Sequence, residues 1–513
     1  MGTVSKKVSS NLLWRLLERF GAQAVTLIVS IVLARLLDPS VYGLIALVTI
    51  FITILQVFVD SGFGVALIQK KDSDDLDFSS VFYFNVVSCS ILYTILFFLS
   101  PLIAGFYEQP DLIPVIRVLG LTIIVSGVKN IQQAYVSKNL LFKRFFFATL
   151  GGTIGAAVVG ITLAYLGYGV WALVAQHLFN LIVDTIILWI TVKWRPKLMF
   201  SFTRLKILFS FGWKLLISAL LDTGYKELCA LIIGKKYSAE DLAYYNRGQQ
   251  FPSIIVTNIN SSIDSVLLPT MSSEQDNAIR VRSMTRRAIK TSTFIMMPMM
   301  VGLAVCADSV VMLLLTEKWM PAVFFLRIFC FVYAFYPIHT ANLNAIKAMG
   351  RSDLFLTLEI IKKVTGLIAI ISTMFISVEA MAYSLLITSV IHQIINAWPN
   401  KKLLNYTYID QIKDMLPQIG IALLMGGVVY CAKFLPVVYW IRLIIQIPVG
   451  IVIYFGLSKL FKVDSFDYII NIAKGYFHRK ATNNCVDTNN TDISSAETDI
   501  TTIKDGNGDN DND

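Results

Sequence analysis

The fold of this chain is decided by residues 11–71, which read NLLWRLLERFGAQAVTLIVSIVLARLLDPSVYGLIALVTIFITILQVFVDSGFGVALIQKK. Two apolar stretches in it are joined by a short polar corner, LLDPS, at residues 36–40. Each stretch is long enough to cross a bilayer as a helix, which takes about 20 apolar residues. Arg15, Glu18 and Arg19 follow at spacings of three and four, so they share one helix face. Because lipid cannot solvate such a face, the stretch predicts membrane helices around a polar interior.

The composition of the whole chain is that of a membrane protein with many spans. Of its 513 residues, 56% are hydrophobic and only 15% are charged, whereas soluble proteins have about 45–50% apolar and about 25% charged residues. The net charge of +10 would suggest nucleic-acid binding in a soluble protein. Here the basic residues lie in short loops between apolar spans, so we expect them to set topology and contact anionic lipid, with no nucleic-acid partner.

The sequence has few features of a metal centre or an enzyme. Its six cysteines show no C-x-x-C spacing and its four histidines are scattered, which argues against a zinc module and a disulfide framework. It has no G-x-x-x-x-G-K-[ST], H-E-x-x-H or G-x-S-x-G motif. We therefore predict no cofactor and a secondary transporter rather than an enzyme. Charges at Arg15, Glu18 and Arg19 interrupt the apolar core that a signal peptide needs, so the first span is expected to stay uncleaved.

Hydropathy predicts an all-α fold with about 14 transmembrane helices. The expected spans lie near residues 12–36, 41–67, 79–106, 112–135, 146–167, 169–192, 207–233, 249–271, 290–315, 321–346, 354–377, 379–400, 415–433 and 437–461.

The charges of the loops predict the orientation of these spans. Alternate loops are rich in lysine and arginine, at Lys6, Lys7, Lys70, Lys71, Lys138, Lys143, Arg144, Lys193, Arg195, Lys197, Arg204, Lys206, Arg280, Arg282, Arg286, Arg287, Lys290, Lys347, Arg351, Lys401, Lys402, Lys413, Arg479 and Lys480. The other loops are short and nearly free of basic residues, apart from Lys235, Lys236 and Lys318. By the positive-inside rule, both termini are expected in the cytoplasm.

The two halves of the chain repeat each other. At an offset of 210 residues, 116–118 (IRV) lies over 326–328 (LRI) and 170–172 (VWA) over 380–382 (AMA). The corner at 39–43 resembles 239–243 at an offset of 200. Six spans followed by six give both halves one orientation, which is a parallel repeat of the kind found in transporters.

The repeat predicts a division into lobes and terminal segments. The predicted segments are a cytoplasmic N-terminus (1–11), an N-lobe of six helices (12–192), a basic cytoplasmic linker (193–206), a C-lobe of six helices (207–400), two extra helices (415–461) and an acidic, disordered cytoplasmic tail (478–513).

Basic side chains inside spans are the first candidates for a functional site, because charge in lipid is costly. The candidate cations are Arg15, Arg19, Lys129, Lys214, Lys362 and Lys363, all in the cytoplasmic half of the predicted spans. Such a cluster suits a phosphate or diphosphate ligand. The alternative is a local ion pair, since Glu359 precedes Lys362 and Lys363 by three and four residues. Lys214 has no acid at helical spacing and is the better candidate for a ligand contact.

Acids and polar stripes complete the predicted interior. The candidates for a polar path or for binding a coupling ion are Glu18, Asp60, Gln176, Asn180, Asp184, Asp222, Asp264 and His392. Gln176, Asn180 and Asp184 follow at intervals of four and so share a helix face. The alternatives are hydrogen bonds between helices, and, for Asp222, a pair with Lys226 four residues on.

Three segments resemble a known family: LLWRLLERFG at 12–21, LARLLDPSVYGL at 33–44 and FVDSGFGVALIQKK at 58–71. The chain is similar to bacterial polysaccharide-unit flippases of the multidrug/oligosaccharidyl-lipid/polysaccharide (MOP) exporter superfamily, in the branch of colanic acid and teichuronic acid exporters. The resemblance covers roughly residues 5–475, with the first hairpin as its most specific part.

The resemblance implies two six-helix lobes around a cavity and alternating access. It implies an undecaprenyl-diphosphate-linked oligosaccharide as substrate, carried across the bacterial inner membrane for surface polysaccharide assembly, and coupling to H⁺ or Na⁺, with the ion varying in the family. Arg15 and Arg19 would line the cavity, and other polysaccharide-assembly proteins would be partners. Two alternatives stay open. A cation-coupled drug exporter of the superfamily should have an acidic cavity, and a membrane-embedded polymerase or glycosyltransferase should have a large loop that this sequence lacks.

Overall fold

The computed structural model describes residues 21–60, 63–70, 72–139, 141–434, 436–471 and 474, except for the side chains of residues 65, 69, 142, 143, 211 and 214. The described elements are helices. A helix at Gly21–Leu36 is followed by α2 (Pro39–Asp60), α3 (Phe63–Gln69), α4 (Asp75–Tyr107), α5 (Leu112–Leu119), α6 (Leu121–Lys138), α7 (Phe142–Tyr165), α8 (Val170–Thr191), α9 (Phe202–Lys236), α10 (Ala239–Ser272), α11 (Ala278–Val305), α12 (Ala307–Leu314), α13 (Ala322–Ala334), α14 (Tyr336–Ala348), α15 (Ser352–Thr373), α16 (Val378–Leu404), α17 (Tyr408–Cys431) and α18 (Tyr439–Leu460), with 3₁₀ turns at Glu317–Trp319 and Ala432–Phe434.

The predicted all-helical, multi-span fold is confirmed. Ten helical segments of the described chain are long and apolar enough to cross a membrane. The shorter helix at 21–36, together with α9, α10 and α15, lies at the other four predicted spans. These four helices carry many of the polar side chains described below, so a count of 14 spans is compatible with the structure.

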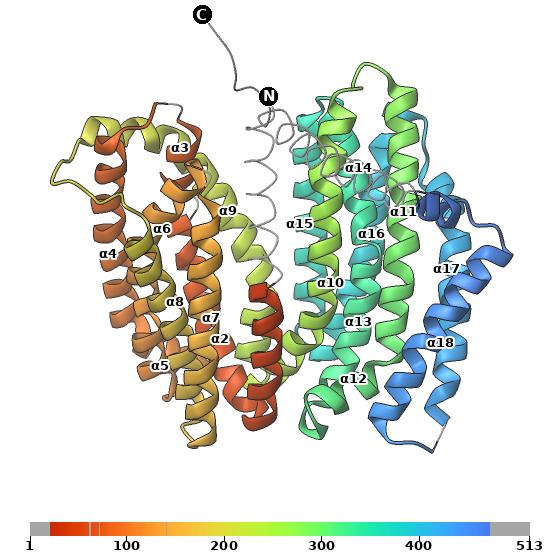
Figure 1. Ribbon diagram of the computed structural model, residues 1–513, viewed down its shortest axis with the longest axis horizontal. Coiled ribbons are helices and arrows are strands. Elements are labelled where there is room, and N and C mark those ends of the chain that lie inside the picture. Colours follow the sequence, from red (N-terminus) through yellow and green to blue (C-terminus); the bar gives the residue numbers. More distant parts are fainter. Residues whose placement is uncertain are drawn as a thin grey trace, which may run out of the picture.

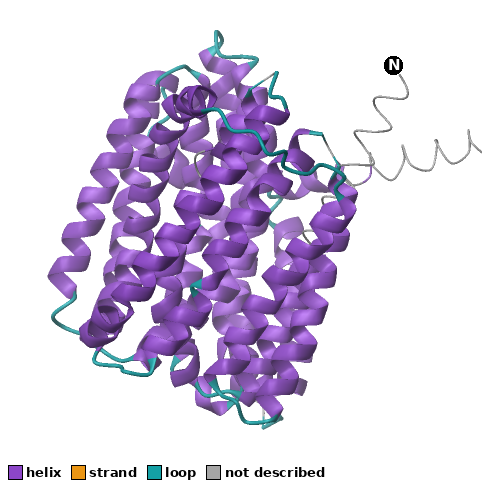
Figure 2. Ribbon diagram, turned by 90° about the vertical axis from the view of Figure 1, so that its left-hand side faces the viewer, coloured by secondary structure: helices purple, strands orange, loops and turns teal. Residues whose placement is uncertain are grey.

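The helices form two groups that run side by side (Figure 1). Helices α2 to α8 make one lobe, and α10 to α18 make the other, with α17 and α18 at its outer edge. The loops gather at the two ends of the helices (Figure 2). One end holds the loops before α4, α7, α9, α11, α15 and α17, and we call it the basic end. The opposite end holds the corner at 37–38 and the loop after α12, and we call it the corner end.

Helix α9 connects the lobes. It begins at the basic end beside α3 and α4 and packs along α2. Its far half contacts the other lobe, where the Tyr237 hydroxyl donates to Met374 O at 3.0 Å and the Tyr225 ring abuts Gly366 of α15. The helix therefore belongs to the packing of both lobes.

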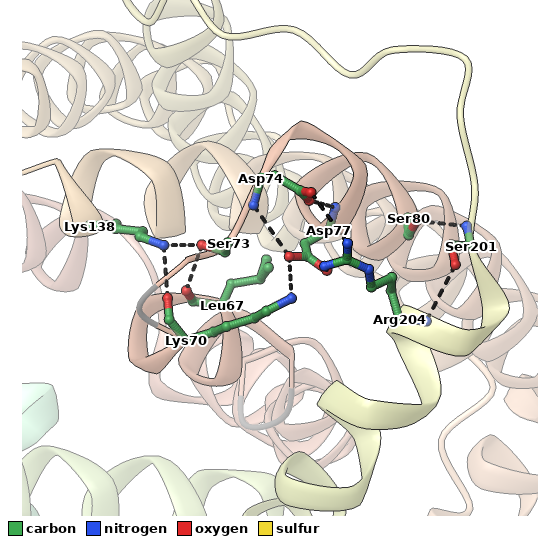
Figure 3. Close-up of polar contacts among 9 residues, drawn as sticks. All are labelled: Leu67, Lys70, Ser73, Asp74, Asp77, Ser80, Lys138, Ser201 and Arg204. Carbon is green, nitrogen blue, oxygen red and sulfur yellow. Dashed lines mark hydrogen bonds and ion pairs between the residues drawn. The ribbon is translucent and has the colours of Figure 1, made fainter.

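The segment before α9 is held to the first lobe by polar contacts at the basic end (Figure 3). Asp77 is fully buried, and its carboxylate lies 2.5 Å from Lys70 Nζ and 3.6 Å from Arg204 Nη1. Ser201, the N-cap of α9, donates its backbone N–H to Ser80 Oγ at 2.9 Å. Asp74 caps α4 by accepting a hydrogen bond from the Asp77 N–H. This hydrogen bond is the main reason why the pKa of the Asp74 carboxyl lies below its ordinary value.

Candidate functional site

A cavity of about 1040 Å³ lies between the two lobes. Its walls come from the helix at 21–36 and from α2, α8, α9, α10, α13 and α14. The charged side chains that line it are Lys226, Glu227, Arg247 and Asp264, so its described wall carries two cations and two carboxylates. Amides, hydroxyls and tyrosines supply most of the remaining polar surface, at Thr26, Ser30, Thr49, Gln176, Asn246, Gln249, Gln250, Asn260, Tyr333 and Tyr336.

Arg247 is the most deeply placed cation of this cavity, with only 6% of its surface exposed. Its Nη1 donates to Ser30 Oγ at 2.6 Å and to Gln250 Oε1 at 2.5 Å. Its guanidinium carbon lies 4.3 Å from the centroid of the Tyr42 ring and 5.2 Å from that of Trp319. Among the residues that the structure describes, no carboxylate forms an ion pair with Arg247. Its charge is therefore held by neutral hydrogen bonds and aromatic faces.

The corner end of the cavity is closed by contacts between the lobes. Trp319 Nε1 donates to Ala34 O at 2.8 Å, and Lys318 Nζ reaches Arg35 O at 3.1 Å and Asp38 Oδ1 at 3.4 Å. Arg35 in turn donates through Nε to Leu314 O at 2.9 Å. The corner at 36–40 that organises the sequence is thus part of this closure.

A second, smaller cavity of about 330 Å³ lies within the first lobe. Among its lining residues are Lys129 of α6 and Asn180 and Asp184 of α8. Lys129 Nζ lies 2.5 Å from Asp184 Oδ2, and both side chains are nearly buried, with 15% and 10% exposed. Thr49 and His177 line both cavities, so the two adjoin.

The predicted candidates fall in four places. Gln176 and Asp264 line the main cavity, and Asp264 accepts a hydrogen bond from Asn344 Nδ2 at 2.8 Å. Lys129, Asn180 and Asp184 line the smaller cavity. Asp60 accepts from Gln56 at 3.2 Å and from Asn130 at 3.3 Å beside it. The structure thus separates Gln176 from Asn180 and Asp184, although all three share a stripe of α8.

The remaining described candidates lie where α9, α15 and α16 meet and line neither cavity. Asp222 Oδ2 is 2.7 Å from Lys226 Nζ, and Asp222 Oδ1 is 3.4 Å from Lys363 Nζ. Lys362 is 2.5 Å from Glu359, as the spacing of the two residues suggested, whereas Lys363 pairs with Asp222 instead of Glu359. His392 Nε2 lies 3.2 Å from Thr365 Oγ1. Every described candidate cation is therefore paired with a carboxylate.

Four candidates cannot be placed in the site. Arg15, Glu18 and Arg19 lie outside the described residues, and only the backbone of Lys214 is described. Their assignment to the cavity stays a prediction. Within the described residues, no group of three or more His, Cys, Asp or Glu side chains is placed to hold a metal ion.

Sequence reasoning missed Arg247, His177 and Glu227 as cavity residues. Arg247 lies before the predicted span at 249–271, but α10 begins at Ala239. The Ser238 capping box, in which Ser238 and Asp241 bond each other's backbone N–H, is the signal that could have shown the earlier start.

The fold of the chain is similar to that of solved membrane transport proteins. The chain aligns with a structure described as lipid II flippase MurJ in an inward closed conformation, with a TM-score of 0.71, 17% identity, and coverage of 88% of this chain and 99% of that one. An inward-facing multidrug resistance MATE family transporter of the MOP superfamily aligns with a TM-score of 0.59, 15% identity, and coverage of 74% and 94%. At these identities the likeness establishes the fold alone.

The sequence profile of the family described as polysaccharide biosynthesis protein matches residues 32–324, and the chain belongs to this family. Teichuronic acid biosynthesis protein TuaB of Bacillus subtilis is 26% identical over 307 residues, which are 58% of this chain and 62% of that protein. Succinoglycan biosynthesis transport protein ExoT of Rhizobium meliloti is 22% identical over 61% of this chain and 64% of its own length. Lipopolysaccharide biosynthesis protein WzxC of Escherichia coli is 23% identical over 70% and 74%. The chain thus spans less than two thirds of the first two relatives.

Proposed function

We propose that this protein carries lipid-linked oligosaccharide units across the bacterial cytoplasmic membrane by alternating access, for the assembly of a surface polysaccharide. The observation that carries the proposal is the polar cavity of about 1040 Å³ between the lobes, with the buried cation Arg247 on its wall. Pockets for drug-sized ligands have volumes of about 300–1,000 Å³. This cavity lies at the upper end of that range and suits a large hydrophilic head group.

The charges of the cavity suit a diphosphate carrier such as undecaprenyl diphosphate. An arginine without a carboxylate partner keeps its donors for an anionic ligand, because a guanidinium binds phosphate oxygens through paired N–H groups. Lys226 supplies a second cation, and the sequence predicts Arg15, Arg19 and Lys214 as further cations of the cavity. The drug-exporter alternative expects an acidic cavity, whereas the described wall has as many cations as carboxylates.

The state of the transporter follows from where the lobes meet. In the described chain, hydrogen bonds between the first six spans and α10 to α18 involve residues 23–38, and those of Arg35, Lys318 and Trp319 gather at the corner end. With the basic end in the cytoplasm, as loop charge predicts, this arrangement is closed to the outside. Both termini would then be cytoplasmic, and an H⁺ or Na⁺ gradient would drive the cycle.

Flipping in proteoliposomes tests the proposal. The purified protein is reconstituted with a fluorescent undecaprenyl-diphosphate saccharide, and bleaching from one leaflet reports the lipid that has crossed. We expect wild type to flip this lipid and Arg247→Gln to flip it at least about tenfold more slowly, the equivalent of 1.4 kcal/mol. Arg351→Gln is the control, since Arg351 is exposed and forms an ion pair with Asp353 two residues away. A folded wild type that flips no saccharide head group would overturn the proposal.

A further inference from the structure

The two lobes place polar pairs at equivalent positions of the repeat. In the first lobe, Asn130 of α6 donates to Asp60 of α2 at 3.3 Å. In the second, Thr340 of α14 donates to Asn260 of α10 at 2.5 Å. Thr340 follows Asn130 by 210 residues and Asn260 follows Asp60 by 200, the same offsets that relate the two halves of the sequence.

The ion pair of the smaller cavity has such a counterpart too. Lys129 of α6 pairs with Asp184 of α8 at 2.5 Å. His339 lies 210 residues after Lys129, and Asn396 lies 212 residues after Asp184. His339 Nδ1 and Asn396 Nδ2 are 2.8 Å apart and link α14 to α16. The corresponding helices are therefore joined by an ion pair in one lobe and by a histidine and an amide in the other, although Asn396 lies two residues beyond the position that the offset of 210 gives for Asp184.

This comparison shows that packing does not require charge at this place. A buried ion pair seldom adds stability over neutral side chains of similar size, because desolvation costs as much as the attraction returns. The second lobe closes the equivalent gap without a carboxylate. Helix packing therefore does not explain why the side chains at Lys129 and Asp184 are charged.

The pair combines an incompletely satisfied carboxylate with a wall of donors. Lys129 contacts Asp184 Oδ2, whereas Asp184 Oδ1 is buried and has no hydrogen-bond partner in the described part of the chain, so Lys129 satisfies one of the two carboxylate oxygens. The cavity of about 330 Å³ beside the pair is at the small end of ligand sites. Asp184 is the one carboxylate among the described residues of its wall. The other polar side chains of the wall can donate to phosphate oxygens, and they are those of Thr49, Gln56, Thr122, Lys129, Thr149, His177 and Asn180.

We propose that Lys129 is an exchangeable anion-binding residue, which Asp184 holds until a phosphate group of the substrate enters the smaller cavity and replaces the carboxylate as its partner. The inference rests on the proposed function and adds to it a second place where the diphosphate is bound. An anion in the main cavity reaches Lys129 past Thr49 and His177, which line both spaces.

The exchange also makes the contact between α6 and α8 depend on whether substrate is bound. The pair joins α6 to α8, and α8 lines both cavities. When Lys129 turns to the anion, this ion pair between α6 and α8 is lost, so loading changes how the two helices are joined. The exchange is a switch between two discrete partners, and the ligand shifts it through its own affinity for the ammonium.

Anion binding to the protein in lipid nanodiscs tests the exchange, with inorganic pyrophosphate and undecaprenyl diphosphate as the two probes. Asp184→Asn removes the competitor, and we expect it to bind at least about tenfold more tightly than wild type, the equivalent of 1.4 kcal/mol. The double variant Lys129→His with Asp184→Asn copies the second lobe and should fold. At about pH 8, where an unperturbed histidine is neutral, it should bind about tenfold more weakly than wild type. Tightening with the lipid alone would support the subsite and assign it to a lipid head group.

Glu359→Gln is the matched control. Its partner Lys362 lies at the same 2.5 Å and is 14% exposed, but both residues of that pair belong to one helix and line neither cavity. We expect wild-type affinity from this variant. Unchanged or weaker binding by a folded Asp184→Asn, or wild-type binding by the double variant, overturns the inference. If wild type flips the lipid but the variants do not show these affinity changes, the inference is wrong and the proposed function stands. If the variants show the affinity changes but wild type does not flip the lipid, the proposed function is wrong and the anion site stands.

Discussion

At the scale of single residues, the polar groups of this protein differ in how their charge is satisfied. Most interior cations have a carboxylate beside them, as Lys129, Lys362 and Lys363 do. Arg247 instead has two neutral acceptors and two aromatic faces. Arginine suits such a place because its planar guanidinium is weakly hydrated and stacks on rings.

We therefore expect Arg247→Lys to be destabilising although it keeps the charge. Lysine has no planar group to stack on Tyr42 and Trp319, and each cation–π contact is worth about 0.5–2 kcal/mol. The free energy of unfolding in detergent should fall by about 1–3 kcal/mol. The control is Arg351→Lys at an exposed site, which should change it by less than about 0.5 kcal/mol. Equal thermal stability of the two variants would show that stacking does not hold Arg247.

Residue pairs on one helix could be predicted from the sequence, and pairs between helices could not. The spacing of Glu359 and Lys362 predicted their contact, and the same holds for Asp222 and Lys226. Lys129 and Asp184 are 55 residues apart on different helices. Only the packing of α6 on α8 brings them together, and a single sequence carries no signal for that register.

At the scale of elements, the start of α9 is fixed to the first lobe. Lys70 and Arg204 reach the buried carboxylate of Asp77 from two different segments. Trp194 and Lys197 of the same linker bind Asp75 at 3.0 Å and 2.6 Å. The basic residues of the linker, which the sequence assigns to topology and lipid, thus also attach α9 to α4.

Asp77→Ala should loosen this attachment. A buried ion pair that loses one partner costs about 3–5 kcal/mol, but Lys70 and Arg204 are 28% and 40% exposed and can turn to water. We expect the free energy of unfolding to fall by about 2 kcal/mol, and hydrogen exchange to rise in residues 193–206. Asp72→Ala, an exposed neighbour, should leave exchange there unchanged. If both variants exchange alike, Asp77 does not anchor the linker.

Hydropathy located the helices well where they face lipid and poorly where they face protein. Helix α10 begins ten residues before its predicted start because its first turns, with Glu240, Asp241 and Arg247, are polar and lie against the other lobe. Three predicted spans are each interrupted within the described chain, at Gly120 between α5 and α6, at Cys306 between α11 and α12 and at Phe335 between α13 and α14. Apolar content does not change at these breaks, so a hydropathy window does not detect them.

At the scale of the whole molecule, alternating access requires the corner end to open. The lobes are in close contact there, between the first turns of α2 and α10. A Cβ built on Gly43 would lie 1.9 Å from Ala239 O and 2.3 Å from Ala239 C, which are backbone atoms of the other lobe. The closed arrangement therefore depends on a residue without a side chain at position 43. The sequence shows a glycine there but not what it faces.

We expect Gly43→Ala to shift the population away from the closed corner end, because a helix backbone cannot move aside as a flexible side chain can. The measurement is the yield of cross-linking by a short bifunctional thiol reagent between cysteines at Asp38 and Lys318, whose charged groups are 3.4 Å apart. Cys431, the exposed cysteine of the described residues, and Cys485 are first replaced by serine. The yield should fall at least about twofold, since even 1 kcal/mol changes a population ratio about fivefold.

Gly456→Ala is the matched control, because its added Cβ would meet no atom within 4 Å. An unchanged yield in a folded Gly43→Ala protein would mean that the lobes close without the contact at Gly43, and the closure would then rest on other contacts at the corner end, such as that of Trp319 with Ala34 O.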